Sequence, residues 1–321
     1  MIRASNLTRT FKTKAGPVEA VRGLSLEVEE GELVAFLGPN GAGKSTSVRM
    51  LTTLLPLTSG QAIIGGHDVA RNPVAVRQLI GYVGQGTGSG PYHRVRDELI
   101  TQGRAYRMSY ADARMRADEL LAVLELEDQA DRDCATLSGG QKRRLDVALG
   151  LMHTPKILFL DEPSTGLDPH SRANLWEHII RLRQQTGMTI FLTTHYLDEA
   201  DNMAERVMIM DHGKMIADDV PEKLKADLAG DQIRLSFQSE QDAGSAAEQA
   251  RSLPTARDVT QEGIRLILTV NKGESLLPGL IHNLHKSGLE VQTANVQRPT
   301  LDDVFLSLTG RSLRESAELP A

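Results

Sequence analysis

The chain has 321 residues, 40% of them apolar, and a net charge of −6, which suits about two domains with cores of their own. No basic tail or block appears, so bulk nucleic-acid binding is not expected. The single cysteine, Cys134, excludes an intrachain disulfide and favours a reducing compartment. We expect neither a signal peptide nor a membrane span, because no apolar run approaches roughly 18 residues.

The first 35 residues have the pattern of strands and turns, with an edge hairpin around Ala15-Gly16-Pro17. The apolar run Leu33–Leu37 then predicts a short buried strand. It leads into GPNGAGKST, Gly38–Thr46, and a segment with helical spacing follows. This succession of strand, glycine loop and helix is the context that a G-x-x-x-x-G-K-[ST] phosphate loop requires.

Each residue type in this loop suits a phosphate group. The glycines let backbone N–H groups turn toward phosphate oxygens, and the helix N-terminus adds partial positive charge. Lys44 is expected to reach the β- and γ-phosphates of a nucleotide, and the Ser45 hydroxyl to ligate magnesium. The predicted nucleotide-binding residues are Gly38, Pro39, Asn40, Gly41, Ala42, Gly43, Lys44, Ser45 and Thr46.

Residues 92–150 are predicted to form a helical insertion. Within it, LSGGQ (Leu137–Gln141) fits an S-x-x-Q capping box that opens the helix Lys142–Leu151. A cap needs no glycines at its second and third positions, so this helix N-terminus is also a candidate anion site, formed by Ser138, Gly139, Gly140 and Gln141. The spacing leaves open whether this loop and the first one grip a nucleotide within one chain or between two.

The apolar run Ile157–Leu160 predicts a strand buried on both faces, and an acidic pair ends it. Asp161 can hold a magnesium ion. Glu162 can orient or deprotonate an attacking water, although it could instead only cap the following loop. Strand and helix patterns alternate over residues 157–210, which implies a parallel sheet.

A domain boundary is expected near Val220-Pro221. Residues 222–310 predict the order β-α-β-β-α-β, the split βαβ arrangement, followed by a last helix that begins at Thr300. That helix is expected to bury four side chains against the domain's own sheet or another chain: Leu301, Val304, Phe305 and Leu308. Nothing here resembles a catalytic constellation. Residues 311–321 are expected to be a flexible tail.

With these motifs in this order, residues 1–218 resemble an ATP-binding cassette (ABC) ATPase. LSGGQ matches the family signature. The resemblance implies that Phe11 stacks on adenine, that Gln85 contacts magnesium and water, and that His195 contacts the γ-phosphate. It also places Asp168 in the D-loop and adds Gln85 to Ser45 and Asp161 as a metal contact. Taken alone, Phe11 could equally be an edge-strand residue and His195 an ordinary hydrogen-bonded side chain.

The resemblance implies an α/β P-loop ATPase domain over residues 1–220, with a mixed β edge, a parallel core sheet and a helical subdomain at about 92–150. A small α+β regulatory or assembly domain follows over residues 221–310. ATP and Mg²⁺ are the implied cofactors, and two chains pair head-to-tail. Each ATP then lies between Gly38–Thr46 of one chain and Ser138–Gln141 of the other. The implied catalytic residues Lys44, Glu162 and His195 are intact, so hydrolysis is implied as well.

Two further stretches narrow the resemblance: RPTLDDVFLSLTGR (Arg298–Arg311) and TTHYLDEAD (Thr193–Asp201). Both are similar to daunorubicin/doxorubicin-resistance-type ATPases, which bind a separate membrane permease at the cytoplasmic side of the membrane and often export drugs. Related exporters of sodium ions, lipids or other metabolites share much of these motifs. Two other classes stay open: a soluble ABC ATPase acting on ribosomes or DNA, and a regulatory module without turnover. The single cassette without sustained heptads disfavours the first, and the intact Glu162 disfavours the second.

One stretch departs from the family pattern. Gly86–Pro91 reads GTGSGP where apolar residues for docking the permease are usual. We expect a flexible loop here, with Tyr92 and His93 as candidate permease contacts by position alone.

Overall fold

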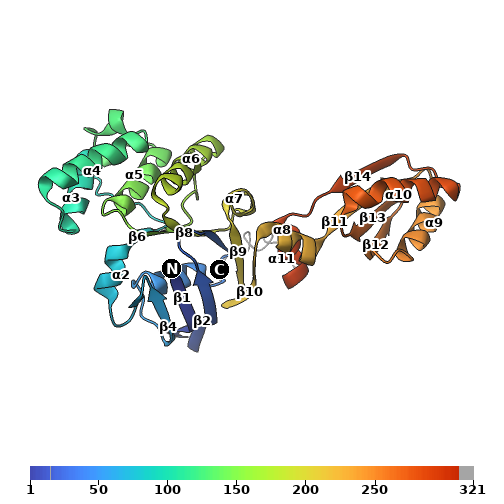
Figure 1. Cartoon of the computed structure of the whole chain (residues 1–321), viewed down its shortest axis with the longest axis horizontal. Helices are drawn as coiled ribbons and strands as arrows, with labels where there is room; N and C mark the ends of the chain where they lie inside the picture. The colour runs from blue at the N-terminus through green and yellow to red at the C-terminus, as the bar shows by residue number, and fades with distance from the viewer. Residues whose placement is uncertain (15, 311–321) are drawn as a thin grey trace. The chain divides into compact units, whose positions relative to one another are not determined.

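The computed structural model describes residues 1–14 and 16–310. Ala15 of the expected hairpin and the expected tail at 311–321 therefore lie outside the described residues. The chain divides into two compact units, Met1–Asp218 and a second unit that begins at Asp219 (Figure 1). Each unit is described by itself.

A six-stranded sheet of order β10-β9-β3-β8-β7-β6 is the centre of the first unit. Neighbouring strands from β9 to β6 pair in parallel. Every residue of β3, β7 and β8 is buried, which explains the continuous apolar runs. Parallel strands bring their carboxyl ends to one edge, so the loops after them meet there. The strands are β3 (Leu33–Leu37), β6 (Ile80–Val83), β7 (Ile157–Asp161), β8 (Thr189–Thr194), β9 (Arg206–Asp211) and β10 (Lys214–Asp219).

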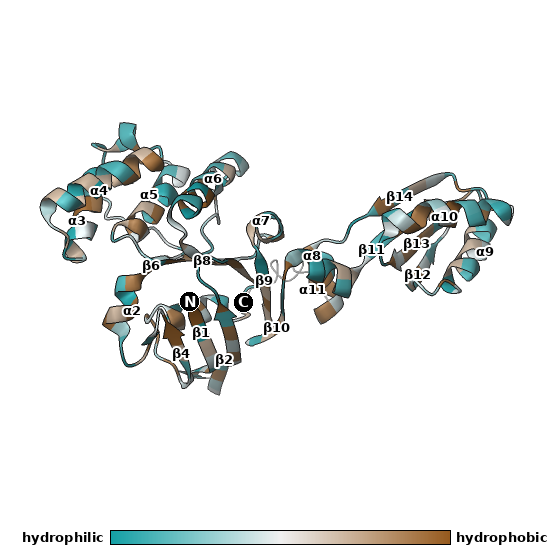
Figure 2. Ribbon diagram, in the orientation of Figure 1, coloured by the Kyte–Doolittle hydropathy of each residue, from teal (hydrophilic) through white to brown (hydrophobic). Residues whose placement is uncertain are grey.

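A four-stranded antiparallel sheet of order β2-β1-β4-β5 packs against the central sheet. The two share one core, in which Ile2 and Leu24 meet Phe36, Phe159 and Phe191. Figure 1 shows this second sheet on one side of the central strands and helices α3 to α6 on the other, and Figure 2 shows apolar residues concentrated on β1 and β4. Its strands are β1 (Ile2–Thr13), β2 (Gly16–Val28), β4 (Ser59–Ile64) and β5 (His67–Asp68).

Helix boundaries in the first unit follow from capping residues. Ser109 accepts a hydrogen bond from the Asp112 amide at the start of α4, and the predicted capping box of Ser138 and Gln141 opens α5. The α6 helix ends at Gly187, whose φ of 68° is left-handed. The helices are α1 (Lys44–Leu51), α2 (Pro73–Leu79), α3 (Val95–Ala105), α4 (Tyr110–Val123), α5 (Gly139–Leu151), α6 (Pro169–Thr186) and α7 (Leu197–Met203), with short 3-10 turns at Glu127–Gln129 and Cys134–Thr136.

The second unit contains a four-stranded sheet of order β12-β13-β11-β14 in which all neighbours are antiparallel. Alanines and leucines of α9 and α10 bury Ile233, Leu235, Leu266 and Leu268. The element order is the one that the sequence predicts: β11 (Asp231–Ser236), α9 (Glu240–Arg251), β12 (Ala256–Glu262), β13 (Arg265–Val270), α10 (Gly273–Lys286) and β14 (Thr293–Gln297).

The last helix, α11 (Leu301–Thr309), begins at a capping box formed by Thr300 and Asp303. It buries Leu301, Val304 and Phe305, whereas Leu308 is only half-buried. Its main contacts are with α8 (Pro221–Leu224) and the π-helical turn Lys225–Ala229. The expected partner surface, a sheet or another chain, is therefore wrong for this stripe, because the segment that enters the unit supplies the apolar surface.

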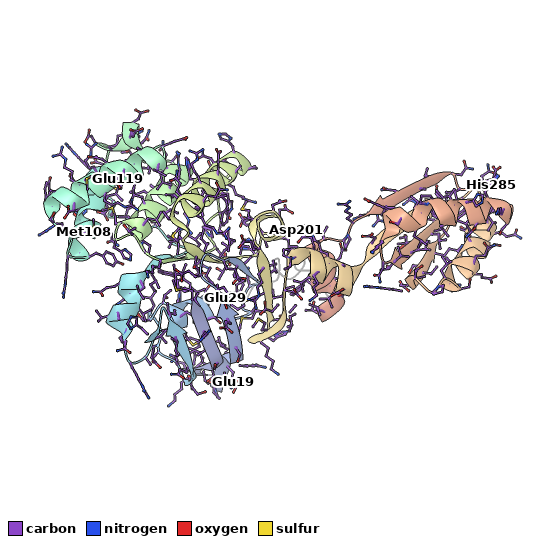
Figure 3. All side chains as sticks on the ribbon, viewed as in Figure 1. Glu19, Glu29, Met108, Glu119, Asp201 and His285 are labelled. Atoms are coloured by element: carbon purple, nitrogen blue, oxygen red, sulfur yellow. The ribbon has the colours of Figure 1, made fainter. Side chains whose placement is uncertain are left out.

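Two histidines lie on the surface of α10, but the described residues show no metal site there. His282 and His285 of that helix are both exposed, and Figure 3 labels His285. No group of three His, Cys, Asp or Glu side chains is arranged for a metal ion in the described part of the chain. Across residues 1–14 and 16–310, none of the helices combines the length and the apolar character needed to cross a bilayer.

Candidate functional site

The glycine loop joins β3 to α1 at the carboxyl edge of the central sheet. Gly38 and Gly43 have φ values of +153° and +107°, which L side chains rarely adopt. A Cβ atom would lie 2.2 Å from the Met210 carbonyl oxygen at Gly38, and 2.4 Å from the Ala20 carbonyl oxygen at Gly43. Glycine is therefore required at both positions for two reasons: the backbone conformation, and the lack of space for a Cβ atom.

Lys44 is the first residue of α1 and only 4% exposed. Its Nζ donates to the carbonyl oxygens of Gly38 (2.6 Å) and Pro39 (3.0 Å) and lies 3.9 Å from Glu162 Oε1. Burial lowers the pKa of Lys44, although the charges of Glu162 and Asp161 act against this. A buried ammonium at a helix N-terminus, with carbonyls as its hydrogen-bond partners, favours the approach of an anion.

Asp161 ends β7 and is fully buried. Its Oδ1 accepts hydrogen bonds from Ser45 Oγ (3.0 Å) and Thr193 Oγ1 (2.6 Å), while its Oδ2 is buried without a hydrogen-bond partner. Gln85 Nε2 donates to Ser45 Oγ at 3.2 Å. The three predicted metal contacts therefore meet. Hydroxyl, amide and carboxylate oxygens, one of them buried and unpartnered, fit a magnesium ion that accompanies a nucleotide.

Glu162 follows directly, with a left-handed φ of +50°. Its amide donates to the carbonyl of Thr193 (3.0 Å), and its Oε2 lies 3.3 Å from His195 Nδ1, without the alignment of a hydrogen bond. The His195 side chain, and then the charge of Lys44, hold the pKa of Glu162 below its ordinary value although burial opposes this. The carboxylate is therefore ionised at neutral pH, as a group that orients or deprotonates water must be.

These side chains surround a cavity of about 290 Å³, lined by Ala20, residues 40–46, Gln85 and Glu162. Phe11 and Asp168 do not line it. The Arg9 guanidinium lies 4.7 Å from the centroid of the Phe11 ring, and Asp168 caps α6 by accepting from the Ser171 amide at 3.0 Å. Gly38, Pro39, Asp161 and His195 are not lining residues either, but each contacts one: Lys44 donates to Gly38 and Pro39, Ser45 donates to Asp161, and Glu162 lies beside His195. Phe11 and Asp168 have no such contact with the cavity.

The signature loop lines a different cavity, of about 230 Å³. Both hydrogen bonds of its capping box are present: the Gln141 amide donates to Ser138 Oγ (3.3 Å), and the Ser138 amide donates to Gln141 Oε1 (2.9 Å). A Cβ atom at Gly140 would lie 2.8 Å from Ser171 Oγ, so α6 leaves room only for glycine there. Within one chain the two loops therefore do not share these cavities. The lining residues are Glu125, Ser138, Gly140, Gln141, Arg144, His170, Ser171 and Asn174.

Two residues of this region, Thr193 and Arg143, are not among the site residues predicted from the sequence. Thr193 contacts both acidic residues, and the parallel register of β7 and β8 pairs it with Asp161. Its place at the end of a predicted parallel strand is a signal that could have found it. Arg143 is 7% exposed and donates to two backbone carbonyl oxygens, that of Pro163, which follows Glu162, and that of Gly84, which precedes Gln85. Nothing in the sequence separates it from its neighbours Lys142 and Arg144.

Two family models match the chain: residues 21–165 match the one described as ABC transporter, and residues 220–309 the one described as ATP-binding protein DrrA1-3-like, C-terminal domain. The daunorubicin/doxorubicin resistance ATP-binding protein DrrA of Streptomyces peucetius is 42% identical, over 99% of this chain and 96% of that protein. The linearmycin resistance ATP-binding protein LnrL of Bacillus subtilis (strain 168) is 34% identical, over 98% of this chain and all of that protein.

Solved structures agree. The dimeric post-hydrolysis state of the ATP-binding cassette MJ0796, bound to ADP and Pi, has a TM-score of 0.64 and 28% identity, and the match covers 68% of this chain and 98% of that one. The cbiO1 protein from Clostridium perfringens, part of the ABC transporter complex cbiONQ, gives 0.63 and 27%, over 70% and 90%. The predicted fold class is confirmed, as is ATP hydrolysis as the enzyme class. The chain belongs to the ATP-binding subunits of ABC transporters, in the daunorubicin/doxorubicin-resistance type, and it is an ATPase.

Proposed function

We propose that the chain powers a bacterial exporter in which two copies work with a separate membrane permease, at the cytoplasmic side of the cell membrane. The observation that carries the two-copy arrangement is the separation of the cavities lined by the glycine loop and by the signature loop. A head-to-tail pair places Ser138–Gln141 of one copy over Gly38–Thr46 of the other. Two solved structures of one relative, the ATP-binding cassette MJ0796, are described as dimeric, which supports the pairing of two copies.

Within each composite site, we assign roles by position. Lys44 and the loop amides bind the phosphates, and Asp168 and Phe11 add contacts at the dimer interface and the adenine. Bound magnesium, which Ser45, Gln85 and Asp161 would hold, supplies charge neutralisation at the phosphates. Glu162 orients the attacking water and takes its proton. His195 supports the ionised Glu162 and contacts the γ-phosphate.

Drug or antibiotic efflux is the transport function that we propose. It rests on relatives named for resistance to daunorubicin, doxorubicin and linearmycin. The alternative is export of sodium ions, a lipid or another metabolite. A relative of 35% identity, the Nod factor export ATP-binding protein I of Rhizobium sp. (strain N33), is named for a different cargo.

A groove of about 430 Å³ beside α2 and α3 is the proposed dock for a permease helix. Val74 presents an apolar side chain there that is 60% exposed, and the Tyr106 ring stacks on His153 with ring centroids 3.8 Å apart. The helices α2 and α3 flank the segment that carries Gln85. A permease helix bound in this groove would therefore act on the segment that carries a proposed metal contact. Tyr92 is 92% exposed and remains a candidate contact. His93 Nδ1 instead lies 2.5 Å from Glu98 Oε2 of the same chain.

For residues 221–310 we propose a regulatory or assembly role. The unit has a compact apolar core and, among its described residues, no cluster of polar side chains that could act as a catalytic site. Truncation after Val220 should preserve ATP binding in calorimetry but impair drug resistance in cells that contain the permease. Wild-type resistance of the truncated protein would show that this unit is dispensable.

The test of the composite site uses two inactive variants. Ser138→Arg blocks the signature loop, and Lys44→Ala disables the glycine loop. Each alone should lose hydrolysis. Mixed in equal amounts, they should regain at most about a quarter of wild-type activity, because half of the random pairs contain one competent site out of two. No recovery, combined with a Glu162→Gln protein that stays monomeric with ATP in light scattering, would overturn the two-copy site. The activity of the mixture is measured with the permease present.

A further inference from the structure

Arg143 lies in the helix that the signature loop opens, and its guanidinium donates to four backbone carbonyls. The acceptors are the carbonyl oxygens of Pro163 (2.5 Å), Gly84 (2.6 Å), Glu162 (3.2 Å) and Asp161 (3.4 Å). The side chain is 7% exposed. A rigid guanidinium fork with five donors can hold several acceptors in one fixed geometry, which a lysine ammonium cannot do.

The four carbonyls belong to the segments that carry the hydrolytic side chains. Gly84 directly precedes Gln85, and the other three form the run that contains Asp161 and Glu162. Glu162 also has a left-handed φ of +50°. Such a conformation is costly for a residue with a side chain and persists where its surroundings hold it. Arg143 is one of the groups that hold it.

Asp146, less than one turn further along α5, extends this contact to the other side of Gln85. Its Oδ2 lies 3.7 Å from Arg143 Nη1, and its Oδ1 accepts from the Gly88 amide at 2.8 Å. The signature helix therefore holds the backbone both before and after Gln85. The sequence predicts a flexible loop at Gly86–Pro91. In the structure two amides of this loop have acceptors: Asp146 accepts from the Gly88 amide, and Glu98 accepts from the Gly90 amide at 2.9 Å.

We propose that Arg143 is a positioning residue for ATP hydrolysis. From the signature helix it sets the backbone of Gln85 and Glu162, so that signature loop and hydrolytic side chains of one chain move as one body. Arg143 is not among the residues that line the cavity of the glycine loop. Its loss should therefore slow turnover rather than weaken ATP binding. This inference rests on the roles proposed above for Gln85 and Glu162.

Arg143→Gln and Arg143→Lys test the proposal, with Arg183→Gln as the matched control. Arg183 is also a partly buried guanidinium of the first unit. It donates to the Gly31 carbonyl (3.0 Å from Nε) and to Glu205 (2.7 Å), and it contacts no residue of the site. Arg143→Gln should lower kcat at least about tenfold while the Kd for ATP stays within about twofold. Arg143→Lys should recover part of kcat. Arg183→Gln should lower Tm and leave kcat within about twofold.

Coupling to Gln85 separates positioning from stability. If Arg143 acts partly through Gln85, the losses in Gln85→Ala and in Arg143→Lys should not add in the double variant. Full additivity, or a parallel loss of kcat and ATP affinity, would overturn the proposal. If Arg143→Gln does not fold, the kcat of Arg143→Lys per bound ATP decides: a wild-type value sinks the inference.

The same assay distinguishes this failure from failure of the assigned site. Should Glu162→Gln retain wild-type turnover, the proposed role of Glu162 is wrong and the Arg143 inference loses its basis. Should Glu162→Gln be inactive while both Arg143 variants turn over normally, only the inference about Arg143 is wrong.

Discussion

The two compact units of the chain differ sharply in what they bury. The first buries charged and polar side chains such as Lys44, Arg143, Asp146, Asp161 and Glu199, each at most 7% exposed. Across residues 219–310, the described part of the second unit, every buried side chain of the core is apolar. Among the described residues, the buried side-chain polar atoms without hydrogen-bond partners, Asp161 Oδ2 included, also lie in the first unit.

This difference separates chemistry from stability. Burying a polar group costs free energy unless it is hydrogen-bonded or paired. The first unit accepts that cost for several groups, among them Lys44, which lines the glycine-loop cavity, and Asp161, which contacts Ser45 of that lining. Variants of the polar groups at this site should therefore change ATP binding or turnover. Variants of the second unit should change the free energy of unfolding and leave the nucleotide alone.

Glu162→Gln should lower kcat for ATP hydrolysis at least about 100-fold, because the amide keeps the shape but cannot accept the proton. The Kd for ATP should change little, since Lys44 and the loop amides remain. Steady-state phosphate release and calorimetry on the same protein check both parts. Turnover within twofold of wild type would place the base elsewhere.

Lys44→Ala should weaken ATP binding by about 10- to 100-fold, in line with the loss of a charge-assisted contact to the phosphates. Direct calorimetric titration at saturating magnesium measures this. Arg183→Gln is the control, because Arg183 contacts no residue of the site, and this variant should keep the wild-type Kd for ATP. An unchanged affinity in Lys44→Ala would contradict the phosphate role of the loop.

Phe305→Ala should destabilise the second unit by about 3–5 kcal/mol, because it opens a cavity under α11, where the side chain is 1% exposed. Leu306→Ala is the matched control on the same helix. Leu306 is 46% exposed, and its removal should cost less than about 1 kcal/mol. Neither change should alter the Kd for ATP. A weakened Kd in Phe305→Ala alone would show that the second unit contributes to nucleotide binding.

The sequence predicts those parts of this arrangement that depend on neighbours along the chain. The glycine loop and the Ser138–Gln141 capping box are patterns of a few residues, and each forms as predicted. The last helix also begins where the sequence predicts, at Thr300. The parallel sheet follows from the buried apolar runs. Because parallel strands end at one edge, even the meeting of Ser45 with Asp161, 116 residues apart, follows from fold class.

Contacts that depend on how separate elements pack are harder to predict. Arg143 reaches Gly84, 59 residues away, and Pro163, 20 residues away, and no periodicity encodes either contact. For α11 the amphipathic pattern shows which face is buried but not what covers it. The contacts of polar loops are also hard to predict from sequence. The composition of Gly86–Pro91 predicts flexibility but does not show that acceptors from α3 and α5 hold two of its amides.

The smallest effect concerns stability and pH in the first unit. The pKa of Glu162 is lowered in the folded chain, first by His195 and then by Lys44. A carboxyl whose pKa is lower in the folded than in the unfolded chain stabilises the fold fully above its unfolded pKa, about 4.5, and loses this contribution as the pH falls through its folded pKa.

Without nucleotide, Glu162→Gln should therefore unfold at a lower Tm than wild type at pH 6–7, and the two values should converge as the pH falls through the folded pKa of Glu162, which lies below 4.5. The control is Glu119→Gln, which removes an exposed ion pair with Arg116 on α4 (Figure 3). Such pairs contribute little, so it should leave Tm nearly unchanged over this range. A Tm difference for Glu162→Gln that grows toward acid pH would mean that the folded chain raises the pKa of this carboxyl. Glu162 would then be protonated more readily than a base for the attacking water should be, and the contact with His195 would need another role.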